Sequence, residues 1–324
     1  MSAAAGPVVT RGTPDAAGVA RFLGDAMRRH FGEATGSPFW LSVAGELDFD
    51  PVRDVVGWRD LERFRPWARR ARAAAPRDLL AAAGTDDDEI VAPELPLPRT
   101  WLEQVVDWRV ARYARGPGRT VGDTLVLLPA GYGFARAVST ARAGRLGSGA
   151  VFANRPAEAP RILDRGGVAY VVTTVELLEG LLDQAPPQAP VWGRIRHITL
   201  YDAHRWPARA RRLREVLPES CEISAILSCP GVLAEFRTGL FGRDGGPLVY
   251  EGFDPYVRWE LADETGRPAG GPGDTATSSA PGVLAVSHLS DRLFLPWAGQ
   301  PVRAVPADGG RPGPGGVRRF EIPG

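Results

Sequence analysis

The pattern of apolar and polar residues changes twice along this 324-residue chain. Up to about residue 100, apolar residues recur at helical spacing, as in VARFLGDAMRRHF (19–31), and strand-like runs are few. From Trp101 to Ser228, short apolar runs alternate with amphipathic segments; the runs include DTLVLLPAG, GAVFAN, VAYVVTT, IRHITLYD and CEISAILS. Such alternation predicts a largely parallel sheet that helices cover on both faces.

A third pattern begins after Ser228. The segments PLVYEG, YVRWELA, GVLAVSHL and PVRAVP are short and strand-like, with Gly, Pro and Asp turns but no helical pattern between them. In YVRWELA, a period of two places Val257, Trp259 and Leu261 on one face. The chain closes on GVRRFEIPG, another extended run, which stops at Pro-Gly. We therefore expect three parts: a helical part over residues 1–100, an α/β part over 101–228 and a small antiparallel β-part over 229–324.

The composition narrows the possible chemistry, because all 39 lysine-plus-arginine positions are arginine. Arginine stays protonated and forms no Schiff base, so pyridoxal chemistry is excluded, as is phosphoryl transfer that depends on a P-loop lysine. The two cysteines, Cys221 and Cys229, are too few for a structural zinc site. We expect them to be buried thiols.

A net charge of +1 argues against nucleic-acid binding. No apolar run reaches the roughly 18 residues of a membrane span, and the first residues lack a signal-peptide pattern, so we expect a cytoplasmic protein. The Arg-rich segment RWPARARRLREVL has Trp206, Ala210, Leu213 and Leu217 at helical spacing, which predicts a helix with its arginines in solvent. Alternatively, this face is a docking surface for an acidic carrier protein or a phosphate-bearing ligand.

Several phrases occur in an order that resembles the adenylate-forming (ANL) superfamily, and within it the phenylacetate-CoA ligase branch. The phrases are SPFWLSVAGELDFDPVRDVVGWRDLERF, TWLEQVVDWRVARYARGPGRTVGDTLVLLPAGYGFARA, YVRWELADETGRPAGGPGDTATSSAPGVLAVSHL and RRFEIPG. The resemblance implies an α/β fold: a large N-terminal domain of mostly parallel sheets flanked by helices, then a small antiparallel β-subdomain. It also implies that RRFEIPG leads to a hinge, so the family's C-terminal lid domain is expected to be absent from this chain.

Members of that family activate a carboxylate with ATP and pass the acyl group to a thiol, and four features needed for this differ here. The segment AAAGTDDDEIVAPELPLPRT, where the phosphate loop is expected, has no glycine-rich turn and four consecutive acidic residues. The family's YGxTE motif corresponds to LSCPGVLAEF, in which Glu235 falls two residues late. Gln300 stands at the position of the ribose-binding aspartate, and no lysine exists to neutralise the carboxylate. We therefore expect that ATP-dependent activation is lost and that no cofactor is used.

The resemblance also locates an acyl or aryl pocket, and the residues that map to it can be read in two ways. The candidate binding residues are Tyr132, Gly133, Phe134, Val138, Ile226 and Ser228. Gly131 and Gly133 flank Tyr132, which suggests that this wall keeps the family's shape. The alternative is that Tyr132 and Phe134 are ordinary core aromatics.

Few residues could perform chemistry at such a pocket. Asp202 and His204 follow a strand in LYDAHRW, where an acid–base pair could form at the carboxyl edge of the sheet; a surface position is the alternative. Cys229 could act as a nucleophile if a base reached it, but none is identifiable. His288 is expected to be structural.

Three functional hypotheses remain open. The first is a degenerate ligase-like protein that binds a hydrophobic acyl or aryl intermediate in specialised-metabolite biosynthesis. It would either catalyse an ATP-independent cyclisation, condensation or dehydration, or assist a partner enzyme. The expected partners are a small acyl or aryl molecule and an acyl or peptidyl carrier protein, with no nucleic acid and no membrane. The second is a genuine ligase completed by a separate C-terminal domain, and the third is a non-catalytic scaffold.

Overall fold

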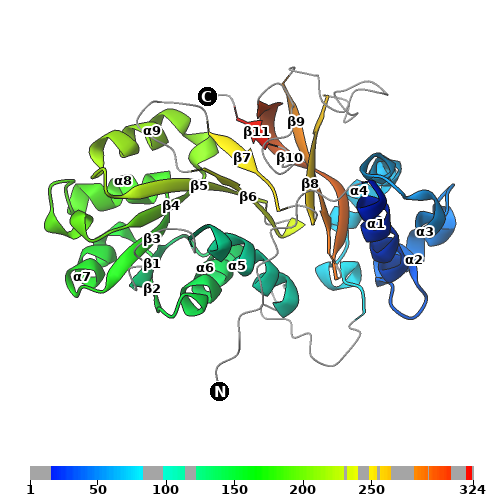
Figure 1. Ribbon diagram of the computed structural model, residues 1–324, viewed down its shortest axis with the longest axis horizontal. Helices are drawn as coiled ribbons and strands as arrows, with labels where there is room; N and C mark the ends of the chain where they lie inside the picture. The colour runs from blue at the N-terminus through cyan, green and yellow to red at the C-terminus, as the bar shows by residue number, and fades with distance from the viewer. Residues whose placement is uncertain are drawn as a thin grey trace.

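The computed structural model describes residues 16–82, 98–113, 122–229, 232–239, 248–253, 256–263, 281–290, 292–307 and 319–322. Within these residues, eleven strands form one sheet in the order β2-β1-β3-β4-β5-β6-β7-β11-β10-β9-β8 (Figure 1). The sheet has a parallel half and an antiparallel half, as the two sequence patterns predict. No helix among the described residues is long and apolar enough to cross a membrane.

The parallel half contains the predicted alternation of strands and helices. Its strands are β1 (Asp123–Leu127), β2 (Ala150–Ala153), β3 (Val168–Thr174), β4 (His197–Tyr201) and β5 (Glu222–Cys229). Its helices are α5 (Arg99–Tyr113), α6 (Gly133–Arg145), α7 (Ala159–Asp164), α8 (Val175–Gln184) and α9 (Pro207–Val216), with the 3₁₀ turns η4 (Pro156–Glu158), η5 (Pro190–Gly193) and η6 (Ala203–Arg205). Helices α5 and α6 lie on one side of the sheet, and α8 and α9 on the other (Figure 1).

The antiparallel half contains β6 (Ala234–Thr238), β7 (Val249–Glu251), β8 (Val257–Ala262), β9 (Gly282–Leu289), β10 (Phe294–Pro306) and β11 (Arg319–Glu321). In β8 the period of two is confirmed, because Val257, Trp259 and Leu261 are all buried. Two features differ from the sequence pattern. Strand β6 pairs with β5 as a hairpin, where Leu233 adopts a φ of 48°. Strand β10 begins before the predicted PVRAVP run, and register shifts interrupt its pairing with β9.

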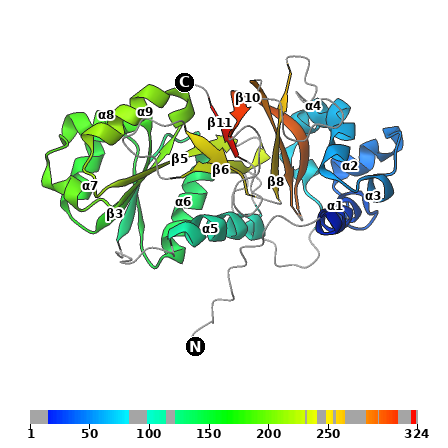
Figure 2. The ribbon, with the colours of Figure 1, turned by 45° about the horizontal axis from the view of Figure 1, so that its top comes forward.

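The N-terminal helices pack against the antiparallel half. They are α1 (Ala16–Phe31), α2 (Pro38–Val43), α3 (Pro51–Asp54) and α4 (Arg65–Ala73), with η1 (Ala44–Glu46), η2 (Trp58–Phe64) and η3 (Pro76–Leu79). Figures 1 and 2 both place α1–α4 beside β8 and β10, at the opposite end of the molecule from α7. The contact is aromatic: Trp40 donates to the Phe294 carbonyl at 3.0 Å, and the Phe64 ring meets the Phe294 ring edge-on at 5.0 Å.

The Arg-rich helix α9 follows the prediction in part. Ala210, Leu213 and Leu217 are buried, but Trp206 precedes the helix and is 41% exposed. Arg214 was expected in solvent and is instead buried, where it donates to the carbonyls of Leu217 and Pro218 at 3.1 and 2.6 Å. Its guanidinium satisfies carbonyls at the end of the helix, which explains why a charge is tolerated there.

Strand β11 lies inside the antiparallel half, where it joins β6 and β7 to β8, β9 and β10. It pairs with β7 on one side and β10 on the other, although it contains the last described residues of the chain. The Phe320 ring is fully buried and contacts Phe236, Tyr250 and Trp259 at centroid distances of 5.1, 5.6 and 4.9 Å. The terminal run therefore contributes to the core of the sheet.

Candidate functional site

The candidate site lies at the carboxyl ends of the parallel strands, where ligands bind in open α/β sheets. Tyr132 follows β1, Asp202 follows β4, and Ser228 and Cys229 end β5. Strands β1, β4 and β5 run parallel within one sheet, so their carboxyl ends share one edge.

Asp202 and Tyr132 form the central contact of this site. The Tyr132 hydroxyl donates a hydrogen bond to the Asp202 carboxylate, and Arg205 lies 3.7 Å from the other carboxylate oxygen. Asp202 has a left-handed φ of 60°, which aspartate tolerates better than most residues. Partial burial raises the pKa of Asp202, and the charge of Arg205 acts in the opposite direction.

A buried polar network lies next to this contact. Arg109 of α5 forms an ion pair with Glu235 of β6 at 2.7 Å, and the two side chains are 4% and 0% exposed. The Tyr201 hydroxyl donates to Glu235 at 2.9 Å and accepts from Arg109. Burial raises the pKa of Tyr201 well above its usual value. The Tyr201 ring meets Tyr132 edge-on at 5.9 Å, which connects the network to the site.

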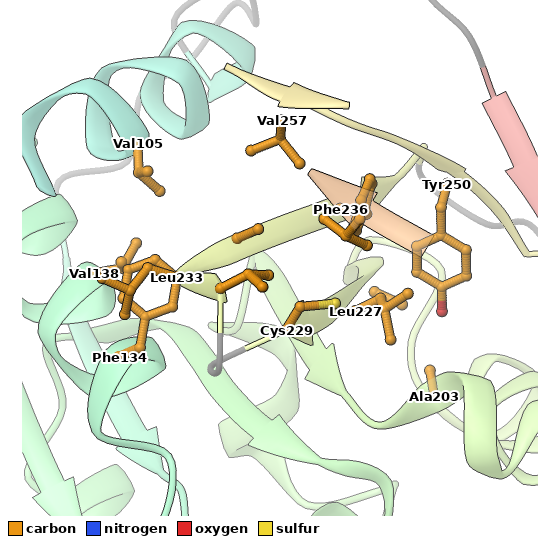
Figure 3. Packing of buried hydrophobic residues seen from close by; sticks show 14 of the residues in the cluster. Val105, Phe134, Val138, Ala203, Leu227, Cys229, Leu233, Phe236, Tyr250 and Val257 are labelled. Atoms are coloured by element: carbon orange, nitrogen blue, oxygen red, sulfur yellow. The ribbon is translucent and has the colours of Figure 1, made fainter. Parts of the chain in front are cut away.

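Tyr250 of β7 brings a further hydroxyl to the same region. Its side chain is fully buried, and its hydroxyl has no hydrogen-bond partner among the described residues. In Figure 3 this hydroxyl points towards Ala203, the residue after Asp202. Burial raises the pKa of Tyr250, and the Asp202 charge raises it further, so the hydroxyl stays protonated at neutral pH. Tyr250 is not among the site residues predicted from the sequence, although the spacing of Leu248 and Tyr250 in PLVYEG places both on one face of a strand.

Burial limits the chemical reactivity of His204 and Cys229. His204 is half-buried, and its Nδ1 atom has no partner in the described part of the chain; the hydrogen bond to Asp202 comes from Tyr132 instead. Burial lowers the pKa of His204 to about 4, with a smaller effect from Arg205, so the ring is neutral at physiological pH. Cys229 is buried, and desolvation raises its pKa to about 12, with a contribution from Glu235. It is a protonated thiol and a poor nucleophile.

The predicted pocket residues do not share one surface. Phe134 and Val138 are fully buried in the main core, near Val105 and Leu233 (Figure 3). Ile226 belongs instead to a smaller cluster, against which Tyr132 packs.

The other pocket positions are more open. Ser228 is half-buried and pairs across the hairpin with Glu235. Gly133 is exposed, and neither it nor Gly131 has a positive φ. A Cβ atom at either glycine would meet nothing within 4 Å, so the backbone does not require glycine there. Both glycines are exposed to solvent on either side of Tyr132.

Glu235 is the acidic residue nearest to the family's magnesium-binding position, and Arg109 and Tyr201 hold it inside the protein. It is therefore not placed to bind a metal ion. Among the described residues, no three His, Cys, Asp or Glu side chains gather as a metal site. The expected phosphate-loop segment, apart from its ends, and the Gln300 side chain lie outside the described residues.

Comparison with known proteins finds solved structures with the same fold as this chain. No protein-family model matches the sequence, and no curated protein matches it. An open conformation of 2-hydroxyisobutyryl-CoA ligase, in complex with 2-HIB-AMP and CoA, is similar with a TM-score of 0.66 at 15% identity, over 97% of this chain and 70% of the ligase. The predicted fold class is confirmed, because this chain shares the fold of the ligase over 97% of its length.

A second structure of that ligase agrees. In the postadenylation state with 2-HIB-AMP, the TM-score is 0.66 at 16% identity, over 97% of this chain and 68% of the ligase. At such low identity the likeness concerns the fold, and the activity of this chain has to be argued from its own residues.

Proposed function

We propose that this protein is a degenerate relative of the phenylacetate-CoA ligases that no longer activates its substrate with ATP. It binds a hydrophobic acyl or aryl intermediate of a specialised-metabolite pathway. It then catalyses an ATP-independent step on that intermediate, such as cyclisation, condensation or dehydration, or presents it to a partner enzyme. The observation that carries the proposal is the buried ion pair between Glu235 and Arg109.

The energetics of this pair support the loss of adenylation. A glutamate that holds magnesium must face the nucleotide, whereas the Glu235 side chain is 0% exposed and paired at 2.7 Å. Breaking a buried ion pair costs about 3–5 kcal/mol, because the remaining charge is left uncompensated. Turning Glu235 towards a metal ion would incur that cost and would also remove the Tyr201 hydrogen bond.

The contact between Tyr132 and Asp202 supports the retained binding site. A half-buried carboxylate with a raised pKa and a phenol that contacts it can exchange a proton with a bound carbonyl compound. His204 lies two residues from Asp202, but its pKa of about 4 makes it a weak base at physiological pH, so the proton exchange is assigned to Asp202 and Tyr132. Gly131 and Gly133 on either side of Tyr132 are exposed, so the turn that carries this phenol is accessible from solvent.

The surface near His204 supports a carrier protein as the donor of the intermediate. Trp206 is 41% exposed, and the Arg209 guanidinium lies 4.7 Å from the centre of its ring. Arg205 and Arg212, from the same Arg-rich segment, are also exposed. Arg209 is paired with Glu179 of α8, whereas the exposed Arg205 and Arg212 beside Trp206 are complementary to an acidic carrier protein. We also propose a cytoplasmic location, which is compatible with the two unpaired cysteines.

The similarity to a CoA ligase favours one alternative, a ligase that is completed by a separate C-terminal domain. Calorimetric titration of the protein with magnesium-ATP separates the two proposals, with an authentic phenylacetate-CoA ligase as the positive control. We expect no heat of binding and no pyrophosphate exchange. Micromolar binding accompanied by exchange would establish the ligase instead.

A further inference from the structure

We propose that Tyr250 is a ligand-binding residue whose hydroxyl donates a hydrogen bond to an uncharged carbonyl oxygen, as in a thioester, held beside Asp202. This inference rests on the proposed function, because it names the chemical class of the ligand at the same site. It adds a residue from the antiparallel half of the sheet, which the sequence resemblance did not indicate.

Two buried tyrosines, Tyr201 and Tyr250, differ in their hydrogen bonding. Tyr201 and Tyr250 are both 0% exposed. The Tyr201 hydroxyl donates to Glu235 and accepts from Arg109, whereas the Tyr250 hydroxyl has no partner in the described part of the chain. A buried hydroxyl without a partner costs free energy, and such groups in native proteins require an explanation. A ligand atom that completes the hydrogen bond is such an explanation.

The Tyr250 hydroxyl is directed towards the candidate site. It points towards Ala203 in Figure 3, and the charge of Asp202 is close enough to act on it. Tyr132 reaches Asp202 from the end of β1, and Tyr250 approaches from β7. Two phenols, one from the segment after β1 and one from β7, therefore lie near the carboxylate that follows β4.

The Tyr250 ring is also held firmly in place. It stacks on Phe320 of β11, with centroids 5.6 Å apart and planes 18° apart. Phe320 in turn packs edge-on against Phe236 at 5.1 Å. Because the ring is fixed, its hydroxyl is preoriented, and little conformational entropy is lost when it donates a hydrogen bond to a ligand atom.

The charges around the Tyr250 hydroxyl restrict the kind of ligand it can bind. Tyr250 stays protonated at neutral pH, so it acts as a donor and needs an acceptor oxygen. A free carboxylate would bring a second negative charge next to Asp202, and the cation that pairs with Asp202, Arg205, is 64% exposed and 3.7 Å away. A neutral carbonyl oxygen accepts the same hydrogen bond without that repulsion. The site therefore suits a thioester, amide or ketone better than the free acid that an adenylating enzyme consumes.

The test compares Tyr250→Phe with Tyr201→Phe as a matched control. Both changes remove one buried phenol oxygen and leave the ring. In urea denaturation, we expect Tyr250→Phe to unfold at the same or a higher urea concentration than the wild type, and Tyr201→Phe at a lower one. If Tyr250→Phe is as destabilising as Tyr201→Phe, the hydroxyl has a structural partner and the inference fails.

The binding arm uses two probes, the N-acetylcysteamine thioester of phenylacetate and phenylacetate itself. We expect the wild type to bind the thioester more tightly than the acid, and Tyr250→Phe to weaken thioester binding by about tenfold with little effect on the acid. Tighter binding of the acid, no binding of the thioester, or equal affinity in the variant would overturn the inference. Binding of magnesium-ATP would instead overturn the proposed function, so the two failures can be distinguished.

Discussion

The guanidinium of Arg109 and the carboxylate of Glu235 lie 2.7 Å apart in the interior, where they connect the long helix α5 to the hairpin strand β6. Tyr201 of β4 bonds to both residues. Three elements that are distant in the sequence are thereby held together directly beside the Tyr132–Asp202 contact. The network therefore positions the site, whatever reaction takes place there.

The first prediction concerns this ion pair. Arg109→Met should lower the free energy of unfolding by about 3–5 kcal/mol, because Glu235 keeps a buried charge without its partner. The double variant Arg109→Met with Glu235→Leu should recover most of that loss. Urea denaturation at neutral pH measures both. As a control, Arg145→Ala removes the ion pair with Asp107, whose side chains are 51% and 48% exposed, and should change stability by about 1 kcal/mol or less.

The second prediction concerns two buried histidines, His30 and His288. In each ring one nitrogen contacts a backbone carbonyl, of Ser290 at 2.9 Å and of Val232 at 2.5 Å, and the other has no hydrogen-bond partner among the described residues. Burial lowers both pKa values from 6.5 to about 4. The unfolded chain therefore binds protons at a higher pH than the folded protein does. The stability that comes from keeping these two histidines neutral is fully present above pH 6.5 and is lost as the pH falls towards 4.

Between the unfolded and folded pKa values, each histidine should lower the free energy of unfolding by about 1.4 kcal/mol for every unit by which the pH is decreased. Urea denaturation at a series of pH values measures the slope. His30→Gln should make the slope shallower across this interval. An unchanged slope in the variant would show that His30 does not remain neutral in the folded protein.

The third prediction concerns β11. Phe320→Ala should destabilise the protein by about 3–5 kcal/mol, because it empties a fully buried position in the middle of the sheet. Phe152→Ala is the matched control, since Phe152 lies on the edge strand β2 and is 41% exposed. Thermal or urea unfolding distinguishes them. Equal effects of the two changes would show that β11 is not a structural strand in solution.

The fourth prediction concerns the Tyr132–Asp202 contact. Tyr132→Phe should reduce binding of the phenylacetyl thioester by about tenfold or less and leave the fold intact, because Tyr132 is only half-buried. Asp202→Asn should leave stability unchanged or slightly raise it, since partial burial already disfavours the charged form. Calorimetry measures binding of the thioester, and circular dichroism measures folding and stability. If neither variant affects binding, the ligand does not occupy this place.

Much of the architecture was predictable because it depends on local patterns. Alternating apolar runs and amphipathic segments predicted the parallel half, and the period of two in β8 predicted which residues are buried. Strand β6 is not evident from the sequence, because buried polar residues, Glu235 and Thr238, stand beside the buried Ala234 and Phe236 and no period of two appears. The start of β10 was missed because Pro296 and the positive φ of Trp297 interrupt any simple alternation.

The candidate site was predictable only in part. Tyr132 and Asp202 were identified as separate candidates, and nothing in the sequence indicated that they contact each other. Arg109 was visible as a charge among the apolar residues of its helix, but its partner could not be named. The exposure of Gly131 and Gly133 could not be foreseen either, since the sequence suggested a conformational role for these glycines.

The sequence by itself determined the order of the elements, the class of fold and the absence of lysine chemistry, because backbone periodicity and residue type are local properties. The tertiary structure decided which side chains meet: Tyr132 with Asp202, Arg109 with Glu235, and the Tyr250 hydroxyl with no described residue at all. These contacts join strands and helices that are far apart in the chain. They arise only when the sheet is assembled, because burial and charge pairing depend on neighbours in space.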